Sequence, residues 1–324
     1  MRPKPDSQQE CTVIEVDKLT RRYGSHTAVD SISFKVGKGE IVGFLGPNGA
    51  GKTTTMRVLT CYQTASAGTA RVAGFDVFEA SMEVRRRIGY LPEHPPLYRD
   101  MRVRAYLDFV ARIKGVASGV RRGRVDDVMA RCGIEDRSGQ LIGQLSKGYQ
   151  QRVGLAQALV HEPEVVILDE PTIGLDPNQI REVRDLIRAL GGEHTVILST
   201  HILPEVEMTC DRVIIIDQGR IVAIDSTEKL LAGDTDSARY EVTVADDADR
   251  AAQAIREVDG VMHVTPVAGQ KGVLLVDARH QEGVQAALAS RLVERGIGLL
   301  GLRRVEASLE DVFHQLTTND EGES

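Results

Sequence analysis

Long apolar runs are missing from this sequence. Its apolar stretches are short and are broken by glycine or proline, whereas a membrane-spanning helix needs about 18 or more such residues in a row. The chain is therefore not expected to form a channel or a permease by itself. Cysteine is also scarce: Cys11, Cys61, Cys132 and Cys210 are scattered without a C-x-x-C pair, which argues against a disulfide framework or a zinc site and indicates reduced thiols in a cytoplasm.

An excess of basic residues is absent as well. The formal net charge is -7, whereas a general nucleic-acid binder would show a basic face. One segment departs from this balance, because residues 99–124 hold eight Arg or Lys against two Asp. This charge is either a solvated helix face or an electrostatic contact with inner-leaflet headgroups or a loop of a membrane protein.

The chain is long enough for two domains. It has 324 residues, of which 42% are hydrophobic and 27% charged, so each domain can bury its own core. The polar opening, residues 1–11, carries no signal peptide and is expected to be disordered. We predict a first domain at 12–231, a linker at 232–238, a second domain at 239–317 and a loose acidic tail at 318–324.

A complete G-x-x-x-x-G-K-[ST] loop occupies residues 46–53, directly after the apolar run 41–45. Its glycines let successive backbone N–H groups curl around an anion, Lys52 can reach the β- and γ-phosphates, and the Thr53 hydroxyl can ligate Mg²⁺. The alternative, a chance glycine-rich turn, is disfavoured by the strand-like run before the loop and the helix-prone residues after it. The predicted nucleotide-binding residues of this segment are Gly46, Pro47, Asn48, Gly49, Ala50, Gly51, Lys52, Thr53 and Thr54.

Two carboxylates end a second apolar run. Residues 165–168 read as a buried parallel strand, and Asp169 and Glu170 follow it. Ligands gather at the carboxyl ends of strands in open α/β sheets, so Asp169 can hold Mg²⁺ while Glu170 orients or deprotonates an attacking water. Charged strand ends are also common without function; the phosphate loop upstream favours catalysis.

A helix is predicted to begin after Ser146, in the segment Leu145-Ser146-Lys147-Gly148-Tyr149. Ser146 is a good N-cap whatever else the segment does. A helix N-terminus with a hydroxyl and a glycine is also a potential anion site.

The order of these motifs closely resembles the ATP-binding subunits of ABC transporters. The phosphate loop (Walker A), the L-S-x-G signature and the Asp-Glu pair (Walker B) are followed by a Pro171 to Asp176 loop and by His201 after the next strand. The resemblance covers roughly residues 12–230. It implies an α/β P-loop ATPase domain with a helical subdomain at about 94–158, ATP and Mg²⁺ as cofactors, and a head-to-tail pairing of two copies.

The resemblance also implies roles for single residues. Tyr23 would stack on adenine, although a plain core tyrosine is the alternative. Ser146 and Gly148 would contact the γ-phosphate bound by the second copy, Asp176 would cross the interface between the copies, and His201 would steady the γ-phosphate. The implied metal-binding residues are Thr53, Glu93 and Asp169, and the implied catalytic residues are Glu170 and His201.

Three positions depart from the family's commonest pattern. Lys147 stands where glycine is usual and Tyr149 where glutamine is usual, which changes the expected contacts to the opposed ATP. Glu93 stands where most members carry a glutamine that touches Mg²⁺ and links to the membrane partner. A carboxylate can still ligate the metal, but it adds negative charge near the phosphates.

The second domain reads as strand 240–245, helix 248–257, strands 261–267 and 272–277, helix 281–295 and strand 298–305. This βαββαβ order suggests a small ferredoxin-like α+β domain. Its middle strands lack the stacking aromatics of an RNA-binding sheet, so regulation or dimerisation is favoured. The closing segment 307–317 resembles the end of ATPases serving type-2 exporters, the group of drug-resistance, gliding-motility and copper-maturation systems.

Three functions are compatible with these features. The favoured one is the ATP-hydrolysing subunit of a type-2 ABC exporter, which works on the cytoplasmic face of the membrane by driving a separate permease. An importer ATPase with a solute-sensing C-terminal domain is the second. A soluble ABC-type ATPase acting on ribosomes or DNA is the third, and the short distance between Thr53 and Leu145 disfavours it because such proteins tend to carry a long coiled coil there or two ATPase halves.

Overall fold

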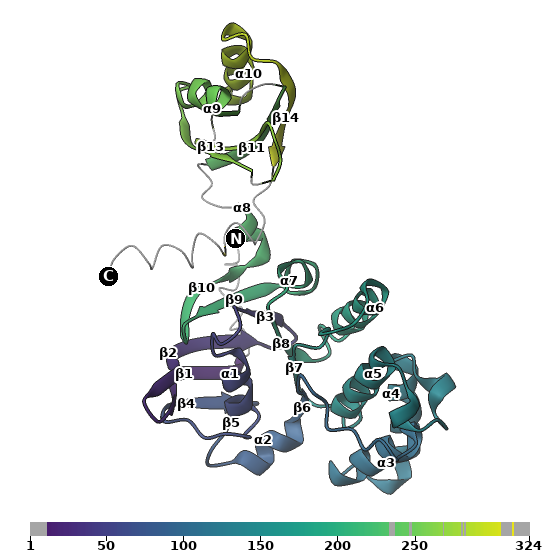
Figure 1. Cartoon of the computed structure of the whole chain (residues 1–324). Helices are drawn as coiled ribbons and strands as arrows, with labels where there is room; N and C mark the ends of the chain where they lie inside the picture. Colours follow the sequence, from purple (N-terminus) through teal and green to yellow (C-terminus); the bar gives the residue numbers. More distant parts are fainter. Residues whose placement is uncertain are drawn as a thin grey trace, which may run out of the picture. The chain divides into compact units, whose positions relative to one another are not determined.

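The computed structural model describes residues 12–232, 237–245, 248–267, 269–279, 281, 283–305 and 313 (Figure 1). The chain divides into two compact units, with the division after Thr227. Among the described residues, no helix is both long and apolar enough to span a bilayer. The N-terminal segment 1–11, the acidic tail 318–324 and, apart from Phe313, the segment 307–317 lie outside the described residues.

A six-stranded, mostly parallel sheet forms the centre of the first unit. Its strands are, in spatial order, β10 (Arg220–Ser226), β9 (Arg212–Asp217), β3 (Ile41–Leu45), β8 (Thr195–Thr200), β7 (Val165–Asp169) and β6 (Ile88–Leu91). Every residue of β3, β7 and β8 is buried, as expected of parallel strands covered on both faces. The predicted α/β class is confirmed, and the carboxyl ends of β3, β8 and β7 lie side by side.

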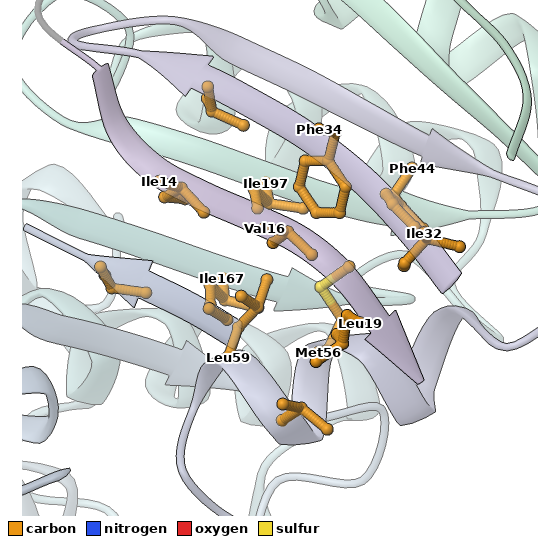
Figure 2. Close-up of a cluster of buried hydrophobic side chains, with 14 of the residues drawn as sticks. Ile14, Val16, Leu19, Ile32, Phe34, Phe44, Met56, Leu59, Ile167 and Ile197 are labelled. Atoms are coloured by element: carbon orange, nitrogen blue, oxygen red, sulfur yellow. The ribbon is translucent and has the colours of Figure 1, made fainter. Parts of the chain in front are cut away.

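A second, antiparallel sheet packs against this centre. It has the order β2 (His26–Gly37), β1 (Thr12–Tyr23), β4 (Ala67–Val72) and β5 (Phe75–Asp76). Figure 2 shows the shared core, in which Ile14 of β1, Phe34 of β2 and Phe44 of β3 meet Met56 of the helix that follows the phosphate loop. The rings of Phe34 and Phe44 have centroids 5.6 Å apart. This packing fixes the position of the phosphate loop, because the loop connects β3 to that helix.

Eight helices longer than one turn are described in the first unit and at its end. They are α1 (Lys52–Leu59), α2 (Ser81–Arg87), α3 (Val103–Ile113), α4 (Ser118–Arg131), α5 (Lys147–Leu159), α6 (Pro177–Arg188), α7 (Leu203–Thr209) and α8 (Thr227–Ala232). Helices α3, α4 and α5 pack on one another in the segment for which the resemblance predicts a helical subdomain (Figure 1). The Gln157 side chain joins this group to the sheet, since it accepts a hydrogen bond from the Tyr106 hydroxyl (2.8 Å) and donates to the Tyr90 carbonyl (3.2 Å).

Several basic side chains of the segment 99–124 form ion pairs or hydrogen bonds within the domain. Arg104 pairs with Asp126 at 2.5 Å, and Arg124 pairs with Glu162. Lys114 donates to the Arg85 and Ile88 carbonyls. The two ion pairs neutralise part of the positive charge that could otherwise contact a membrane or a partner.

His161, which follows α5, should make stability depend on pH. Its Nε2 lies 3.0 Å from the Ile88 carbonyl oxygen, and burial, with the nearby Lys114 ammonium, lowers its pKa to about 4. The unfolded chain, with a histidine pKa near 6.5, then binds more protons than the folded one between about pH 4 and 6.5. Stability contributed by neutral His161 is therefore present above this window and is lost as the pH falls through it.

We expect the melting temperature of a His161→Gln variant to fall less between pH 7 and pH 5 than that of the wild type. Differential scanning calorimetry at several pH values measures both curves. Parallel curves would show that His161 is already as readily protonated in the folded chain as in the unfolded one.

The second unit has the element order βαββαβ that the sequence predicts. Its antiparallel sheet has the order β12-β13-β11-β14, and α9 and α10 share its apolar core. The elements are β11 (Ser237–Val244), α9 (Ala248–Arg256), β12 (Val261–Pro266), β13 (Val273–Arg279), α10 (Val284–Glu294) and β14 (Leu299–Val305). Regular structure extends into the predicted linker 232–238: Ala232 belongs to α8, and Ser237 belongs to β11 because it pairs with Arg279 of β13.

Candidate nucleotide-binding and catalytic site

The phosphate loop turns sharply between β3 and α1, and glycine is required at two of its positions. A Cβ on Gly46 would lie 2.3 Å from the Ile216 carbonyl oxygen, and one on Gly51 would lie 2.5 Å from the Ala28 carbonyl oxygen. Gly51 also has a φ of 105°, in the left-handed region that favours glycine. The loop is therefore held tightly against its neighbours, while Pro47, Asn48 and Gly49 are exposed at its tip. Gly51 is the N-cap of α1 and carries no side chain, so the first amides of the helix remain available to an anion.

The Lys52 ammonium lies across this loop. It donates to the Gly46 carbonyl at 2.7 Å and to the Pro47 carbonyl at 3.1 Å, and it lies 3.6 Å from Glu170 Oε1. Only 6% of the residue is exposed. Burial lowers the pKa of Lys52, and the Glu170 carboxylate opposes that shift. A buried cation that rests on weak carbonyl acceptors is well suited to receive a phosphate.

Asp169 brings the two motifs together at the end of β7. Its Oδ1 accepts hydrogen bonds from the Thr53 hydroxyl (3.3 Å) and the Ser199 hydroxyl (2.5 Å). The side chain is fully buried, which raises its pKa, while the two hydroxyls hold the pKa down. Its other oxygen, Oδ2, is buried without a hydrogen-bond partner in the described part of the chain.

The oxygens of Thr53 and Asp169 fit Mg²⁺. Hydroxyl and carboxylate oxygens are the ligands that this cation prefers, and it is usually held by one or two protein groups together with substrate phosphates. The unpartnered Asp169 Oδ2 is a buried acceptor that a metal-bound water or the cation could satisfy. No group of three or more His, Cys, Asp or Glu side chains that could hold a metal occurs among the described residues.

Glu170 is held in a strained conformation. Its φ is 50°, in the left-handed region that residues other than glycine seldom adopt. The Glu170 amide donates to the Ser199 carbonyl at 2.9 Å, and its carboxylate lies 2.9 Å from His201 Nδ1. Strain of this kind is found where a functional side chain must point in one direction. Glu170 thus points between Lys52 and His201.

His201 stands just beyond β8, with 41% of its side chain exposed. The structure therefore brings together the predicted residues Lys52, Thr53, Asp169, Glu170 and His201, from the ends of three adjacent strands. Ser199 was not predicted from the sequence. A polar residue inside the buried run 196–200 was the available signal, because a hydroxyl there needs a partner on the neighbouring strand.

Glu93 follows β6, the next strand beyond β7. Its side chain is 38% exposed and lies 3.7 Å from His94 Nδ1. Its negative charge raises the pKa of Asp169, so Glu93 is close to the predicted metal ligands. No direct contact between Glu93 and Thr53 or Asp169 occurs in the described structure.

Tyr23 lies at the end of β1, 40% exposed. Its hydroxyl donates to Gln63, and the Arg21 guanidinium lies 4.7 Å from its ring centroid. The ring is therefore a surface side chain and not a core one, which removes the plain alternative of a buried tyrosine.

The remaining predicted residues form a second group at the starts of α5 and α6. Ser146 caps α5 by accepting from the Tyr149 amide (3.4 Å), and Asp176 caps α6 by accepting from the Asn178 and Gln179 amides (3.0 Å each). A Cβ on Gly148 would lie 2.6 Å from the Gln179 side chain, so the two helix starts touch.

Lys147 and Tyr149, which depart from the family pattern, have partners outside this second group. The Lys147 ammonium packs directly against Gly174: a Cβ added to Gly174 would lie 2.0 Å from Lys147 Nζ. The Tyr149 hydroxyl lies 3.4 Å from Asp136 Oδ2. In the described chain no hydrogen bond or ion pair joins this second group to the phosphate loop.

Comparison with known proteins extends these observations. A profile described as ABC transporter matches residues 29–173. The chain is 36% identical over 307 residues to the bacitracin transport ATP-binding protein BcrA of Bacillus licheniformis, covering 94% of this chain and 97% of that one. It is 34% identical over 307 residues to the Nod factor export ATP-binding protein I of Paraburkholderia xenovorans, covering 94% and 96%. Among solved structures, cbiO1 from Clostridium perfringens, part of the ABC transporter complex cbiONQ, matches with a TM-score of 0.63 and 30% identity, covering 69% of this chain and 92% of that chain.

Proposed function

Because the chain belongs to the ABC transporter family, as an ATP-binding subunit that hydrolyses ATP, we propose that it powers export through a separate membrane permease. The observation that carries the ATPase part of this proposal is the convergence of Lys52, Asp169, Glu170 and His201 at the carboxyl ends of adjacent strands. This arrangement supports the proposal, because Lys52 would act as the phosphate-binding cation, Asp169 as a metal ligand and Glu170 as the base of one site.

The residues divide the chemistry among them. The amides of the loop 46–51 and the Lys52 ammonium bind the β- and γ-phosphates. Thr53 and Asp169 would hold Mg²⁺, which neutralises charge on the phosphates when bound. Glu170 accepts a proton from the attacking water, and His201, 2.9 Å from Glu170, steadies that carboxylate and the γ-phosphate. The exposed ring of Tyr23 offers a face for adenine.

Two copies act together in this proposal. Ser146, Gly148 and Asp176 lie on the starts of α5 and α6, and within the described chain they make no bond to the phosphate loop. Helix starts favour anions, so we assign these residues to the nucleotide of a second, head-to-tail copy. Hydrolysis then separates the copies.

Export is favoured over the other functions by the relatives. One similar chain is described as a Nod factor export protein and another as a bacitracin transport protein. The test is to co-express the chain with a six-span membrane protein encoded beside its gene and to measure Mg-ATP hydrolysis by the purified complex. Absence of hydrolysis would overturn the enzyme assignment, and a partner set that includes a periplasmic binding protein would favour import.

Glu93→Gln should alter the use of Mg²⁺ and not the binding of nucleotide. Residues around a metal are typically worth about 10–100-fold in its affinity, so we expect the Mg²⁺ concentration for half-maximal turnover to change by about 10-fold when the carboxylate charge is removed. ATP affinity in EDTA should stay the same. His94→Gln, at the adjacent exposed position, is the control, and superimposable Mg²⁺ titrations of all three proteins would place Glu93 outside the metal site.

A further inference from the structure

We propose that Glu205 is a positioning residue for hydrolysis, whose buried carboxyl ties the segment that carries His201 to the loop that carries Glu170. The proposal rests on the proposed function, because it assigns a role within the same ATPase site. It adds a residue from α7 that neither the sequence motifs nor the nucleotide contacts single out.

The first arm of this connection leads to His201. Glu205 Oε2 accepts a hydrogen bond of 3.2 Å from the Thr200 hydroxyl, and the same hydroxyl accepts from the Ile202 amide at 3.0 Å. The Glu205 amide in turn donates to the Ile202 carbonyl at 3.1 Å. His201 lies between the two residues that these bonds hold, so Glu205 fixes the turn from which the imidazole reaches Glu170.

The second arm leads to Glu170. Thr172, two residues after Glu170, is 3% exposed, and its hydroxyl lies near enough to the Glu205 carboxyl to lower its pKa. The Thr172 hydroxyl and Glu205 Oε1 are both buried and lack a hydrogen bond of ordinary geometry with any described residue. A donor and an acceptor left open beside each other can bond after a small rotation, which would link the loop after Glu170 to α7.

The buried carboxyl of Glu205 is energetically unfavourable at this position. Glu205 is only 4% exposed, and burying a carboxyl is unfavourable unless its oxygens are bonded. Burial raises the pKa of Glu205, the Thr172 and Thr200 hydroxyls oppose that shift, and the neighbouring Glu170 carboxylate adds to it. An apolar side chain would fill the same volume without this cost, but it could not accept the hydrogen bond from Thr200 or offer an acceptor to Thr172. The position therefore fits a role in orienting the segments that carry these two threonines.

The test compares Glu205→Ala with Glu205→Gln in Mg-ATP hydrolysis by the full-length protein. Orienting partners of active groups are typically worth about 10–100-fold, so we expect Glu205→Ala to lower kcat by about 10-fold or more while KM for ATP changes by less than about threefold. Glutamine keeps an acceptor for Thr200 and gains a donor for Thr172, so its kcat should stay within about threefold of wild type. Glu207→Ala, on the same helix, is the matched control and should behave like wild type.

A double-mutant cycle separates positioning from a general loss of stability. If Glu205 acts through His201, Glu205→Ala should lower kcat little further in a His201→Ala background, whereas an unrelated defect would multiply the two losses. Multiplying losses, or a kcat of the Glu205→Ala variant within about twofold of wild type, would overturn the proposal. If Glu205→Ala does not fold, Thr200→Val decides, because it removes the donor at nearly constant shape and should lower kcat similarly; a wild-type kcat would overturn the proposal. A wild-type protein without ATPase activity would instead reject the proposed function itself.

Discussion

Glu170→Gln is expected to lower kcat for ATP by about 10²–10⁴, the usual worth of a positioned general base. Glutamine keeps the size of the side chain and its ability to accept a hydrogen bond from His201, but it cannot take a proton from water. ATP binding should survive, because Lys52 keeps its contacts in the phosphate loop and Thr53 and Asp169 remain in place. A phosphate-release assay with a parallel ATP-binding titration measures both effects.

Glu164→Gln is the matched control for this substitution. Glu164 stands just before β7, at the opposite end of the strand from Glu170, and pairs with Arg87 at 3.2 Å. We expect it to leave kcat nearly unchanged. Near-normal hydrolysis by Glu170→Gln would reject Glu170 as the base.

The same variant also reports on the pairing of two copies. If hydrolysis separates the copies, Glu170→Gln should accumulate as a dimer in Mg-ATP and run as a monomer without nucleotide in size-exclusion chromatography. If Glu170→Gln loses hydrolysis but forms no dimer in Mg-ATP, Glu170 remains assigned as the general base and the head-to-tail pairing of two copies is contradicted. The contacts of Lys147 with Gly174 and of Tyr149 with Asp136 would then be examined first.

The elements that position the site could be predicted because their sequences are locally distinctive. The runs 41–45 and 165–169 are apolar almost throughout, as required of parallel strands buried on both faces. The spacing of glycines in the loop 46–51 reflects the close approaches that Gly46 and Gly51 make to neighbouring carbonyls. In these strands and in this loop, the residue types that the local sequence pattern shows are the ones that the tertiary position of the segment requires.

The missed features depend on pairings between distant segments. Asp169 meets Ser199 because β7 and β8 align in that register; the hydroxyl in a buried strand indicates that Ser199 needs a partner but not which residue that partner is. Glu205 contacts Thr200 because α7 packs against the end of β8, and its spacing after His201 resembles that of any helix carboxylate. The left-handed conformation of Glu170, whose amide donates to the Ser199 carbonyl, could likewise not be predicted, since glutamate has no preference for it.

Lys52→Ala should nearly abolish ATP binding. The ammonium is the buried cation of the loop, with Nζ 2.7 Å from the Gly46 carbonyl and 3.6 Å from Glu170, and two charge-assisted hydrogen bonds to phosphate at about 1.5–3 kcal/mol each correspond to about 10²–10⁴ in affinity.

Equilibrium binding of labelled ATP with Mg²⁺ measures this loss, with Lys38→Ala as the control, since Lys38 is an exposed lysine before β3, at the strand's other end from the loop. Removing Lys52 also leaves the Glu170 carboxylate without its nearest cation, so the loss should be larger in the wild-type background than beside Glu170→Gln. Equal losses in the two backgrounds would show that Lys52 acts on the phosphates alone, and wild-type affinity in Lys52→Ala would reject the phosphate loop as the binding site.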